Sequence, residues 1–253
     1  MSRIFAITNQ KGGVGKTTTA VNLSASMANM GRKVLLIDFD PQGNTTSGLG
    51  LRAGKKSIYE ALLLDFNIKE CLVQTMIPKL HLIPADIRLA GAEIELAPLD
   101  NREFKLKKII DSIESNYDDI FIDCPPSLSL LTINALVAAK SVLVPIQCEY
   151  YALEGVTSLM QTINRVKKAY NPQLDIEGIL LTMFDGRTNL SIQVVESVKK
   201  HFKSKVFSVA IPRNVRLGEA PSHGLPIHLY DNRSLGAEAY NTLAKELIAR
   251  AKK

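Results

Sequence analysis

A short apolar segment, a glycine-rich loop and a helical segment follow one another at the start of the chain. Residues 4–8 read Ile-Phe-Ala-Ile-Thr, residues 9–18 read Asn-Gln-Lys-Gly-Gly-Val-Gly-Lys-Thr-Thr, and a helical pattern covers residues 17–30. Glycines let backbone N–H groups turn inward around a phosphate, and the N-terminus of the next helix adds the positive end of its dipole. The order of these segments therefore predicts a phosphate-binding loop between a strand and a helix.

The loop contains two lysines, Lys11 and Lys16. Lys16 would reach the terminal phosphates of a nucleotide, and the Thr17 hydroxyl would ligate Mg²⁺. The common pattern G-x-x-x-x-G-K-[ST] fails because Gln10 occupies its first glycine position. A turn with two exposed lysines is the alternative, but the flanking strand and helix favour a phosphate site. The residues expected to contact the nucleotide are Lys11, Gly12, Gly13, Val14, Gly15, Lys16, Thr17 and Thr18.

Three carboxylates lie at the ends of two further apolar segments. Asp38 ends the segment 33–38, and Asp40 follows two residues later, so on an extended chain both point to the same side. One of them can order the shell of a metal ion while the other positions an attacking water. Asp123 ends the segment 120–123, as expected for an acid that reaches Mg²⁺ through water. The alternative for Asp38 and Asp40 is a solvated strand–loop junction.

Short aliphatic segments alternate with longer helical patterns along the whole chain. Most of the short segments lack polar alternation, as expected for parallel strands that are buried on both faces. The pattern predicts one domain over residues 1–253, a doubly wound α/β fold with a mostly parallel sheet flanked by helices. The expected strands cover residues 4–8, 33–38, 81–84, 120–123, 141–146, 176–183 and 206–211. The expected helices cover residues 17–30, 58–64, 89–96, 102–116, 130–138, 153–169, 191–201 and 235–251.

The sequence is typical of a cytoplasmic protein. Its first apolar segment is too short for a secretory signal, and no apolar run approaches the roughly 20 residues that span a bilayer. Three widely spaced cysteines make disulfides and a zinc site unexpected: Cys71, Cys124 and Cys148.

The positive charge is concentrated in the last quarter of the chain. Residues 1–186 carry 19 Lys and Arg against 20 Asp and Glu, whereas residues 187–253 carry 12 against 5. Basic side chains from separate elements can merge into a patch that neutralises phosphates. No interleaved aromatic residues or base-reading motif appear, so the alternatives are sequence-independent DNA binding and a solvated surface. The candidates are Arg187, Arg213 and Arg216 in loops and Lys199, Lys200, Lys203 and Lys205 near the end of a helix.

The loop sequence Lys-Gly-Gly-Val-Gly-Lys-Thr, residues 11–17, resembles the deviant Walker A motif of the ParA/MinD group of P-loop ATPases. Four longer stretches are similar to the chromosomal ParA proteins of that group, so the resemblance covers essentially the whole chain. They are DPQGNTTSGL (40–49), LAGAEIEL (89–96), PIQCEYYALEG (145–155) and IPRNVRLGEAPSHG (211–224).

The resemblance implies a slow, Mg²⁺-dependent ATPase for chromosome or plasmid segregation. ATP binding would drive face-to-face homodimerisation and sequence-independent binding of double-stranded DNA on the nucleoid. A ParB-type centromere-binding protein would stimulate hydrolysis and release the dimer. By this resemblance, Lys11 contacts the nucleotide of the partner subunit, Asp40 positions the catalytic water, and Asp38 and Asp123 belong to the magnesium site. Pro212 and Asn214 contact adenine, and Arg187 and Arg216 bind DNA.

Two other functions occur among proteins that share this loop motif. In a MinD-type ATPase the last helix binds lipid, but the apolar face of residues 243–253 is small and lacks Phe and Trp. We therefore expect no stable membrane association. In an iron-protein type of reductase, cysteines of two subunits bridge a cluster, and three isolated cysteines do not suggest one.

Overall fold

Alternate side chains of the central strands enter two different hydrophobic cores. The computed structural model describes residues 2–54, 56–149 and 152–251, with the backbone alone for 152–155. On β1 (Arg3–Ile7), Ile4 and Ala6 belong to one core, whereas Phe5 and Ile7 belong to the other. Because successive side chains of a strand point to opposite faces, apolar side chains cover both faces of the sheet.

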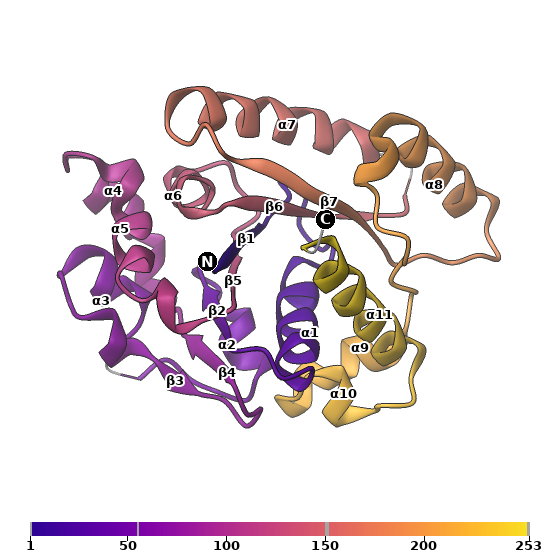
Figure 1. Cartoon of the computed structure of the whole chain (residues 1–253), viewed down its shortest axis with the longest axis horizontal. Helices are drawn as coiled ribbons and strands as arrows, with labels where there is room; N and C mark the ends of the chain where they lie inside the picture. The colour runs from indigo at the N-terminus through magenta and orange to yellow at the C-terminus, as the bar shows by residue number, and fades with distance from the viewer. Residues whose placement is uncertain (1, 55, 150–151, 252–253) are drawn as a thin grey trace.

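The described residues form a seven-stranded sheet in the order β3-β4-β2-β5-β1-β6-β7 (Figure 1). Every neighbouring pair is parallel except β3 and β4, which are antiparallel. This topology confirms the prediction of a doubly wound, mostly parallel α/β fold. The other strands are β2 (Val34–Asp38), β3 (Val73–Gln74), β4 (Leu80–Ile83), β5 (Asp119–Asp123), β6 (Ser141–Gln147) and β7 (Asp175–Thr182).

The helices cover the two faces of the sheet (Figure 1). Helices α3 to α8 pack into the core that contains Ile4, while α1 and α9 to α11 pack into the core that contains Phe5. The short helix α2 lies against α1 and the turn Ala220–His223. The bounds are α1 (Lys16–Asn29), α2 (Asn44–Gly48), α3 (Ile58–Leu63), α4 (Ala92–Leu96), α5 (Lys105–Asp111), α6 (Leu130–Ala138), α7 (Ala152–Ala169), α8 (Asn189–Phe202), α9 (Val215–Glu219), α10 (Ile227–Tyr230) and α11 (Leu235–Arg250).

The segment 206–211 is not a strand of the sheet, so this prediction was wrong. The N–H groups of Phe207 and Ile211 bond to carbonyls of β7 that are only two residues apart, and the chain between them bulges. The N–H of Ser208 bonds instead to the Glu246 carboxylate on α11, at 3.0 and 3.1 Å. The seventh strand is β3, which the sequence analysis did not predict.

The helix expected over residues 102–116 is interrupted. Its centre is α5, and tight 3₁₀ turns at Arg102–Phe104 and Glu114–Asn116 flank it. The buried amide of Asn134 explains the first break, because it accepts from the N–H of Leu106 and donates to the carbonyl of Arg102. Side-chain bonds thus replace those of a continuous helix.

The apolar face of α11 is buried, as expected for a helix that docks on the body of the protein. Tyr240, Leu243 and Leu247 lie in the core beside α1, and the Tyr240 hydroxyl is 3.1 Å from that of Thr19. Residues 252–253 of the expected C-terminal amphipathic segment lie outside the described residues. Within the described part of the chain, no helix has the length and apolarity to cross a bilayer.

Two glycines bring α2 and the C-terminal segment into backbone contact. Gly50 follows α2 with φ +70°, and Gly224 follows the turn Ala220–His223 with φ +65°. A Cβ atom on Gly224 would lie 2.4 Å from the Cα of Gly50. The two segments can therefore meet only where neither residue has a side chain.

We predict that Gly224→Ala lowers the free energy of unfolding by about 2–4 kcal/mol, because it adds left-handed backbone strain to a backbone clash. Urea denaturation followed by circular dichroism measures the change. Gly218→Ala in α9 is the matched control, since a Cβ atom there meets nothing within 4 Å. Equal stability of the two variants would show that the glycine contact is not close-packed in solution.

Candidate active site at the carboxyl edge of the sheet

The strand order brings the glycine-rich loop and two of the predicted carboxylates together. Strand β5 lies between β1 and β2, with Asp123 opposite both Ile7 and Asp38. Parallel strands end at the same edge of a sheet, so Asp38, Asp123 and the loop that follows Ile7 lie side by side.

The loop is held in its curved shape by two glycines and by a contact with β7. Gly13 and Gly15 adopt φ values of +73° and +88°, which residues with a Cβ atom rarely adopt. Gly15 is the N-cap residue of α1, and the Thr182 hydroxyl donates to the carbonyl of Val14 at 2.8 Å. The N-terminus of α1 is therefore fixed toward the inside of the loop, where it can bind an anion.

Lys16 lies inside the site, with only 6% of its surface exposed. Its Nζ donates to the carbonyl of Lys11 at 3.2 Å. Burial lowers the pKa of this ammonium group, and the carboxylates of Asp123 and Asp40 oppose the shift. A phosphate in the loop would give Lys16 a stronger partner than the carbonyl that it contacts here.

Asp123 is fully buried and accepts two hydroxyl hydrogen bonds on one oxygen. The donors to its Oδ2 are Thr17 at 2.8 Å and Thr45 at 2.6 Å. Its Oδ1 is buried and has no hydrogen-bond partner among the described residues. Burial raises the pKa of Asp123 to about 6, and the two threonine bonds oppose that rise.

Asp38 is also buried, and Thr46 is its main partner. The N–H and the hydroxyl of Thr46 donate to Oδ2 of Asp38 at 2.8 and 2.6 Å. Burial and the neighbouring Asp123 raise the pKa of Asp38 to about 7.

Asp40 is 7% exposed and accepts from the N–H of Gln42 at 3.0 Å. The third predicted carboxylate therefore lies at the same edge.

The groups around Asp123 fit a magnesium ion. A buried carboxylate oxygen without a partner, next to the Thr17 hydroxyl, is a suitable acceptor for a hydrated cation. Mg²⁺ uses few protein carboxylates and completes its shell with water and phosphate oxygens. In the described part of the chain, no group of three or more His, Cys, Asp or Glu could hold a metal ion.

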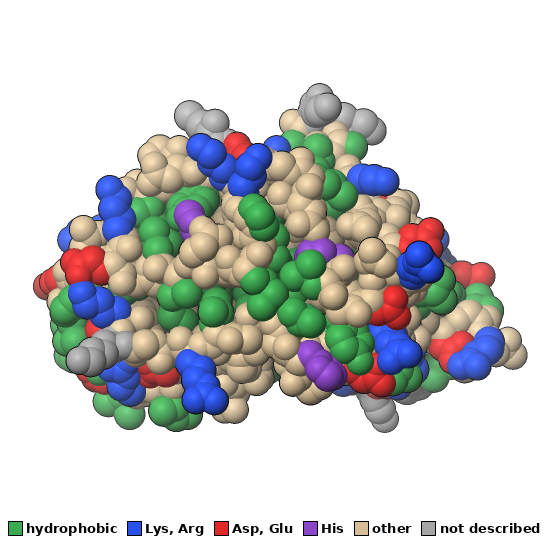
Figure 2. Space-filling view, turned by 90° about the horizontal axis from the view of Figure 1, so that it is seen from below, with side chains coloured by type: hydrophobic (Ala, Val, Ile, Leu, Met, Phe, Trp, Pro, Cys, Tyr) green, Lys and Arg blue, Asp and Glu red, His purple; other side chains and the backbone are tan. Residues whose placement is uncertain are grey.

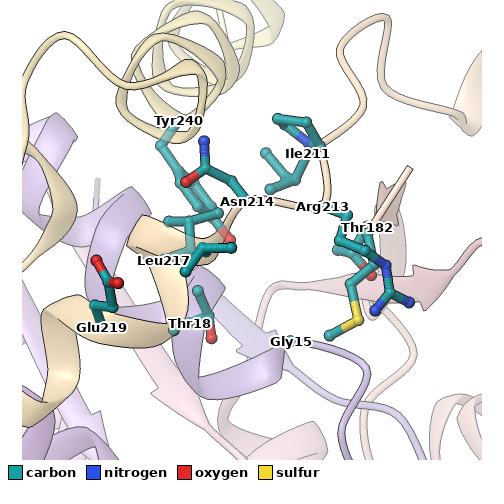
Figure 3. A pocket seen from close by; sticks show the side chains of 13 residues that line it. Gly15, Thr18, Thr182, Ile211, Arg213, Asn214, Leu217, Glu219 and Tyr240 are labelled. Carbon is teal, nitrogen blue, oxygen red and sulfur yellow. The ribbon is translucent and has the colours of Figure 1, made fainter. Parts of the chain in front are cut away.

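A mostly apolar cavity of about 510 Å³ opens beside the loop (Figure 3). Gly15 and Thr18 form one wall, and the segment around Pro212 and Asn214 forms the other. Asn214 caps α9, because its Oδ1 accepts from the N–H of Arg216 at 2.8 Å. The two residues expected to contact a nucleotide base therefore line a cavity next to the phosphate loop.

Lys11, the opening lysine of the loop, has its carboxylate partner outside the loop. Its Nζ is 3.3 Å from Oε2 of Glu149, which follows β6. The two loop lysines therefore have different partners, one inside the site and one at its border.

Arg187 lies in the loop between β7 and α8, and Arg216 lies in the first turn of α9, which follows a neighbouring loop at the same edge. The N–H of Arg213 bonds to the carbonyl of Phe184, which joins the two loops. Both guanidinium groups are exposed and already paired, Arg187 with Asp185 at 2.7 Å and Arg216 with Glu219 at 2.8 Å.

The basic side chains expected to merge into a patch fall into two groups along the chain. Arg187 precedes α8, whereas Lys199, Lys200, Lys203 and Lys205 lie at the other end of that helix. Lys205 bonds to Asp175 at the start of β7, and Arg187 follows the end of that strand. On the face shown in Figure 2, Lys and Arg side chains are scattered and do not gather into one patch.

Four residues of this edge were not anticipated. Thr45 and Thr46 bind the buried carboxylates, Thr182 holds the loop, and Glu149 binds Lys11. The two threonines directly follow the loop after Asp40, and hydroxyl groups there could have indicated partners for the acids. Thr182 and Glu149 approach only through tertiary structure, and nothing in their local sequence indicates it.

Comparisons with known proteins identify relatives over the full chain. A family model described as "AAA domain" matches residues 2–176. The sporulation initiation inhibitor protein Soj of Bacillus subtilis (strain 168) is 58% identical over 251 residues, which cover 98% of this chain and 99% of the relative. The chromosome partitioning protein ParA of Myxococcus xanthus is 56% identical over 99% of this chain and 89% of the relative.

A solved structure shares the fold over the whole chain. Cobyrinic acid a,c-diamide synthase from Mycobacterium smegmatis, crystallised with ADP and magnesium, superposes with a TM-score of 0.88 at 39% identity. The match covers 100% of this chain and 96% of that one.

We predict that Thr46→Val lowers the free energy of unfolding by about 1–3 kcal/mol, because the buried N–H of Ala85 and the carboxylate of Asp38 lose a hydroxyl partner. Ser47→Ala, one residue further along α2, removes an exposed hydroxyl and should change stability by less than about 0.5 kcal/mol. Urea denaturation of the two variants makes the comparison. A negligible effect of Thr46→Val would contradict the assignment of Thr46 as the main partner of Asp38.

Proposed function

This chain belongs to the Soj/ParA family of chromosome-partitioning ATPases, and from this premise we propose that it segregates chromosomal or plasmid DNA by ATP-gated dimerisation. ATP binding would pair two subunits face to face, the dimer would bind double-stranded DNA without sequence preference, and hydrolysis would release it. One observation carries the proposal: the Lys16 ammonium contacts the phosphate loop of its own subunit, whereas the Lys11 ammonium contacts Glu149 outside that loop.

The loop residues 11–18 and the adjacent cavity would hold ATP. The N–H groups of the loop and the Lys16 ammonium bind the phosphates, and the cavity wall at Pro212 and Asn214 receives the adenine. Thr17, Asp38 and Asp123 would hold Mg²⁺, with Asp38 and Asp123 acting mainly through water. When bound, the ion neutralises charge that develops on the β- and γ-phosphate oxygens.

Hydrolysis requires a water molecule in line with the bond that breaks. Asp40 lies beyond the end of β2 next to the loop, so its carboxylate can orient this water toward the γ-phosphorus. The oxygen of the water forms the new bond to phosphorus, one of its protons passes to a phosphate oxygen, and ADP leaves with the electrons of the broken P–O bond. Lys16 stabilises the charge within one subunit, and Lys11 of the partner would add a second ammonium, as arginine fingers do at a gain of about 10³–10⁵ in rate.

Arg187 and Arg216 would contact DNA phosphates. Their present carboxylate partners are Asp185 for Arg187 and Glu219 and Asp231 for Arg216, so phosphate contacts would replace exposed ion pairs of small net stability. Non-specific binding of this kind has dissociation constants of about 10⁻⁴–10⁻⁶ M and weakens steeply with salt. Pairing doubles the number of contacts, which explains how ATP can control DNA binding.

The proposed function also implies where the protein acts and which protein stimulates it. We expect the whole chain to act as one ATPase domain in the cytoplasm, associated with the nucleoid and without stable membrane association. A ParB-type centromere-binding protein would stimulate hydrolysis. The names of the relatives, Soj and ParA, support this proposal.

We predict that Lys11→Ala and Asp40→Ala separate pairing from hydrolysis. Asp40→Ala should form an ATP-bound dimer that persists, because the attacking water is no longer oriented. Lys11→Ala should lose dimerisation and about 10³-fold in hydrolysis rate, since no ammonium crosses to the partner. Light scattering and a phosphate-release assay measure both, with the exposed Lys69→Ala as control. Wild-type hydrolysis by Lys11→Ala would contradict the role in the partner's site.

We predict that Arg187→Ala combined with Arg216→Ala weakens DNA binding by about tenfold or more while ATP-dependent dimerisation survives. Lys199→Ala combined with Lys200→Ala removes the same charge at the far end of α8 and should have a smaller effect. Retention of random-sequence DNA at several salt concentrations tests both. If the two double variants lose the same amount of DNA affinity, binding depends on the overall charge of the protein and not on Arg187 and Arg216.

A further inference from the structure

Hydrogen bonds through Asn9 fix the backbone of Lys11 independently of the contact that its side chain makes. Its N–H donates to Oδ1 of Asn9 at 3.1 Å, and Nδ2 of Asn9 donates to the carbonyl of Pro145 on β6 at 2.7 Å. Asn9 is buried, so these bonds tie the opening of the loop to the body of the sheet. The Lys11 side chain therefore leaves the loop from a defined point, toward the chain that follows β6.

Glu149 is the carboxylate that receives Lys11. Its Oε2 lies 3.3 Å from the Lys11 ammonium, and its Oε1 accepts from Nε2 of Gln147 at 2.5 Å. Arg213 approaches the same Oε1, at 3.8 Å. Two cations from different segments thus converge on one carboxylate at the border of the nucleotide cavity.

We propose that Glu149 is a positioning residue for Lys11: it holds the ammonium in its own subunit until the nucleotide of a partner replaces it. This inference rests on the proposed function, because it assumes that Lys11 serves the partner's site. In a single subunit the ion pair keeps Lys11 away from its own phosphates. Pairing of two subunits then requires that each Lys11–Glu149 contact break.

Arg213 keeps Glu149 from being left without a cation when Lys11 moves. Its side chain lines the cavity and extends toward the side where Thr182 lies (Figure 3). A closer contact with Glu149 needs only a shift of an exposed guanidinium group that already lies 3.8 Å away. The exchange of Lys11 for Arg213 therefore preserves the charge balance at the end of β6.

The expected size of the effect follows from the exposure of the pair. The side chains of Lys11 and Glu149 are 40% and 44% exposed, so the contact is of the surface type. Breaking one exposed pair of this kind changes the equilibrium constant of the step that breaks it by up to about fivefold. Because a two-fold symmetric dimer breaks two of these contacts, the dimerisation constant changes by the square of that factor, up to about 25-fold.

The test compares dimerisation of the full chain in the presence of Mg²⁺ and a non-hydrolysable ATP analogue. Sedimentation equilibrium over a protein concentration series gives the dimer dissociation constant for wild type, Glu149→Gln, Glu149→Asp and the control Glu196→Gln. Glu196 is exposed on α8 and has no ion pair among the described residues, so it changes the charge equally without touching Lys11.

We expect Glu149→Gln to dimerise about 4- to 25-fold more tightly than wild type at 50 mM salt, with the difference lost at 500 mM salt because the pair is ionic. Glu149→Asp should restore dimerisation close to the wild-type value, and Glu196→Gln should match wild type. A structural role alone would not produce this dependence on charge and salt.

Two results would overturn the inference. If wild type dimerises but Glu149→Gln dimerises no more tightly than Glu196→Gln, Glu149 does not hold Lys11 back, while the proposed function stands. If wild type stays monomeric with the ATP analogue, the proposed function fails, and the role of Glu149 fails with it.

Discussion

Burial of the Lys16 ammonium beside acidic side chains determines how the whole edge of the sheet is charged. A cation inside the protein must be balanced nearby, and Asp40 and Asp123 supply that balance. The acids are in turn held by hydroxyl groups rather than by further cations. Lys11 finds its partner outside this group, at Glu149. One short loop thus holds one ammonium inside the site and one at its border, where the proposed pairing of two subunits would need it.

Helix α2 connects the buried acids to the C-terminal part of the chain. Its Thr45 and Thr46 bind Asp123 and Asp38, and the residue that follows the next turn, Gly50, touches Gly224. Beyond Gly224, the N–H of Ile227 donates to the buried Oδ1 of Asn22 on α1 at 2.6 Å. These contacts place the proposed metal site, the apolar cavity and the segment that carries Arg216 on one continuous packed framework.

The sequence was sufficient for the parts of the fold that depend on local patterns. Six of the seven predicted strands, the phosphate loop and the long helices follow from apolar runs and glycine positions, and the edge at which Asp38 and Asp123 meet follows from the parallel topology. The bulge at 206–211 could not be predicted, because Glu246, 38 residues away, accepts the hydrogen bond from the N–H of Ser208. The break in the helix at 102–116 likewise depends on Asn134. Glu149 was not predicted either, because only the tertiary structure shows that its carboxylate contacts the Lys11 ammonium. The two halves of the basic quarter are near in sequence yet separated by the length of α8.

We propose that only the triphosphate allows two subunits to pair so that the opening lysine of each contacts the nucleotide of the other. Light scattering of the wild-type chain with Mg²⁺ and either ADP or a non-hydrolysable ATP analogue tests it most directly. We predict a mass near the 27.8 kDa of one chain with ADP and about twice that mass with the analogue. The same mass in both nucleotides would contradict the account.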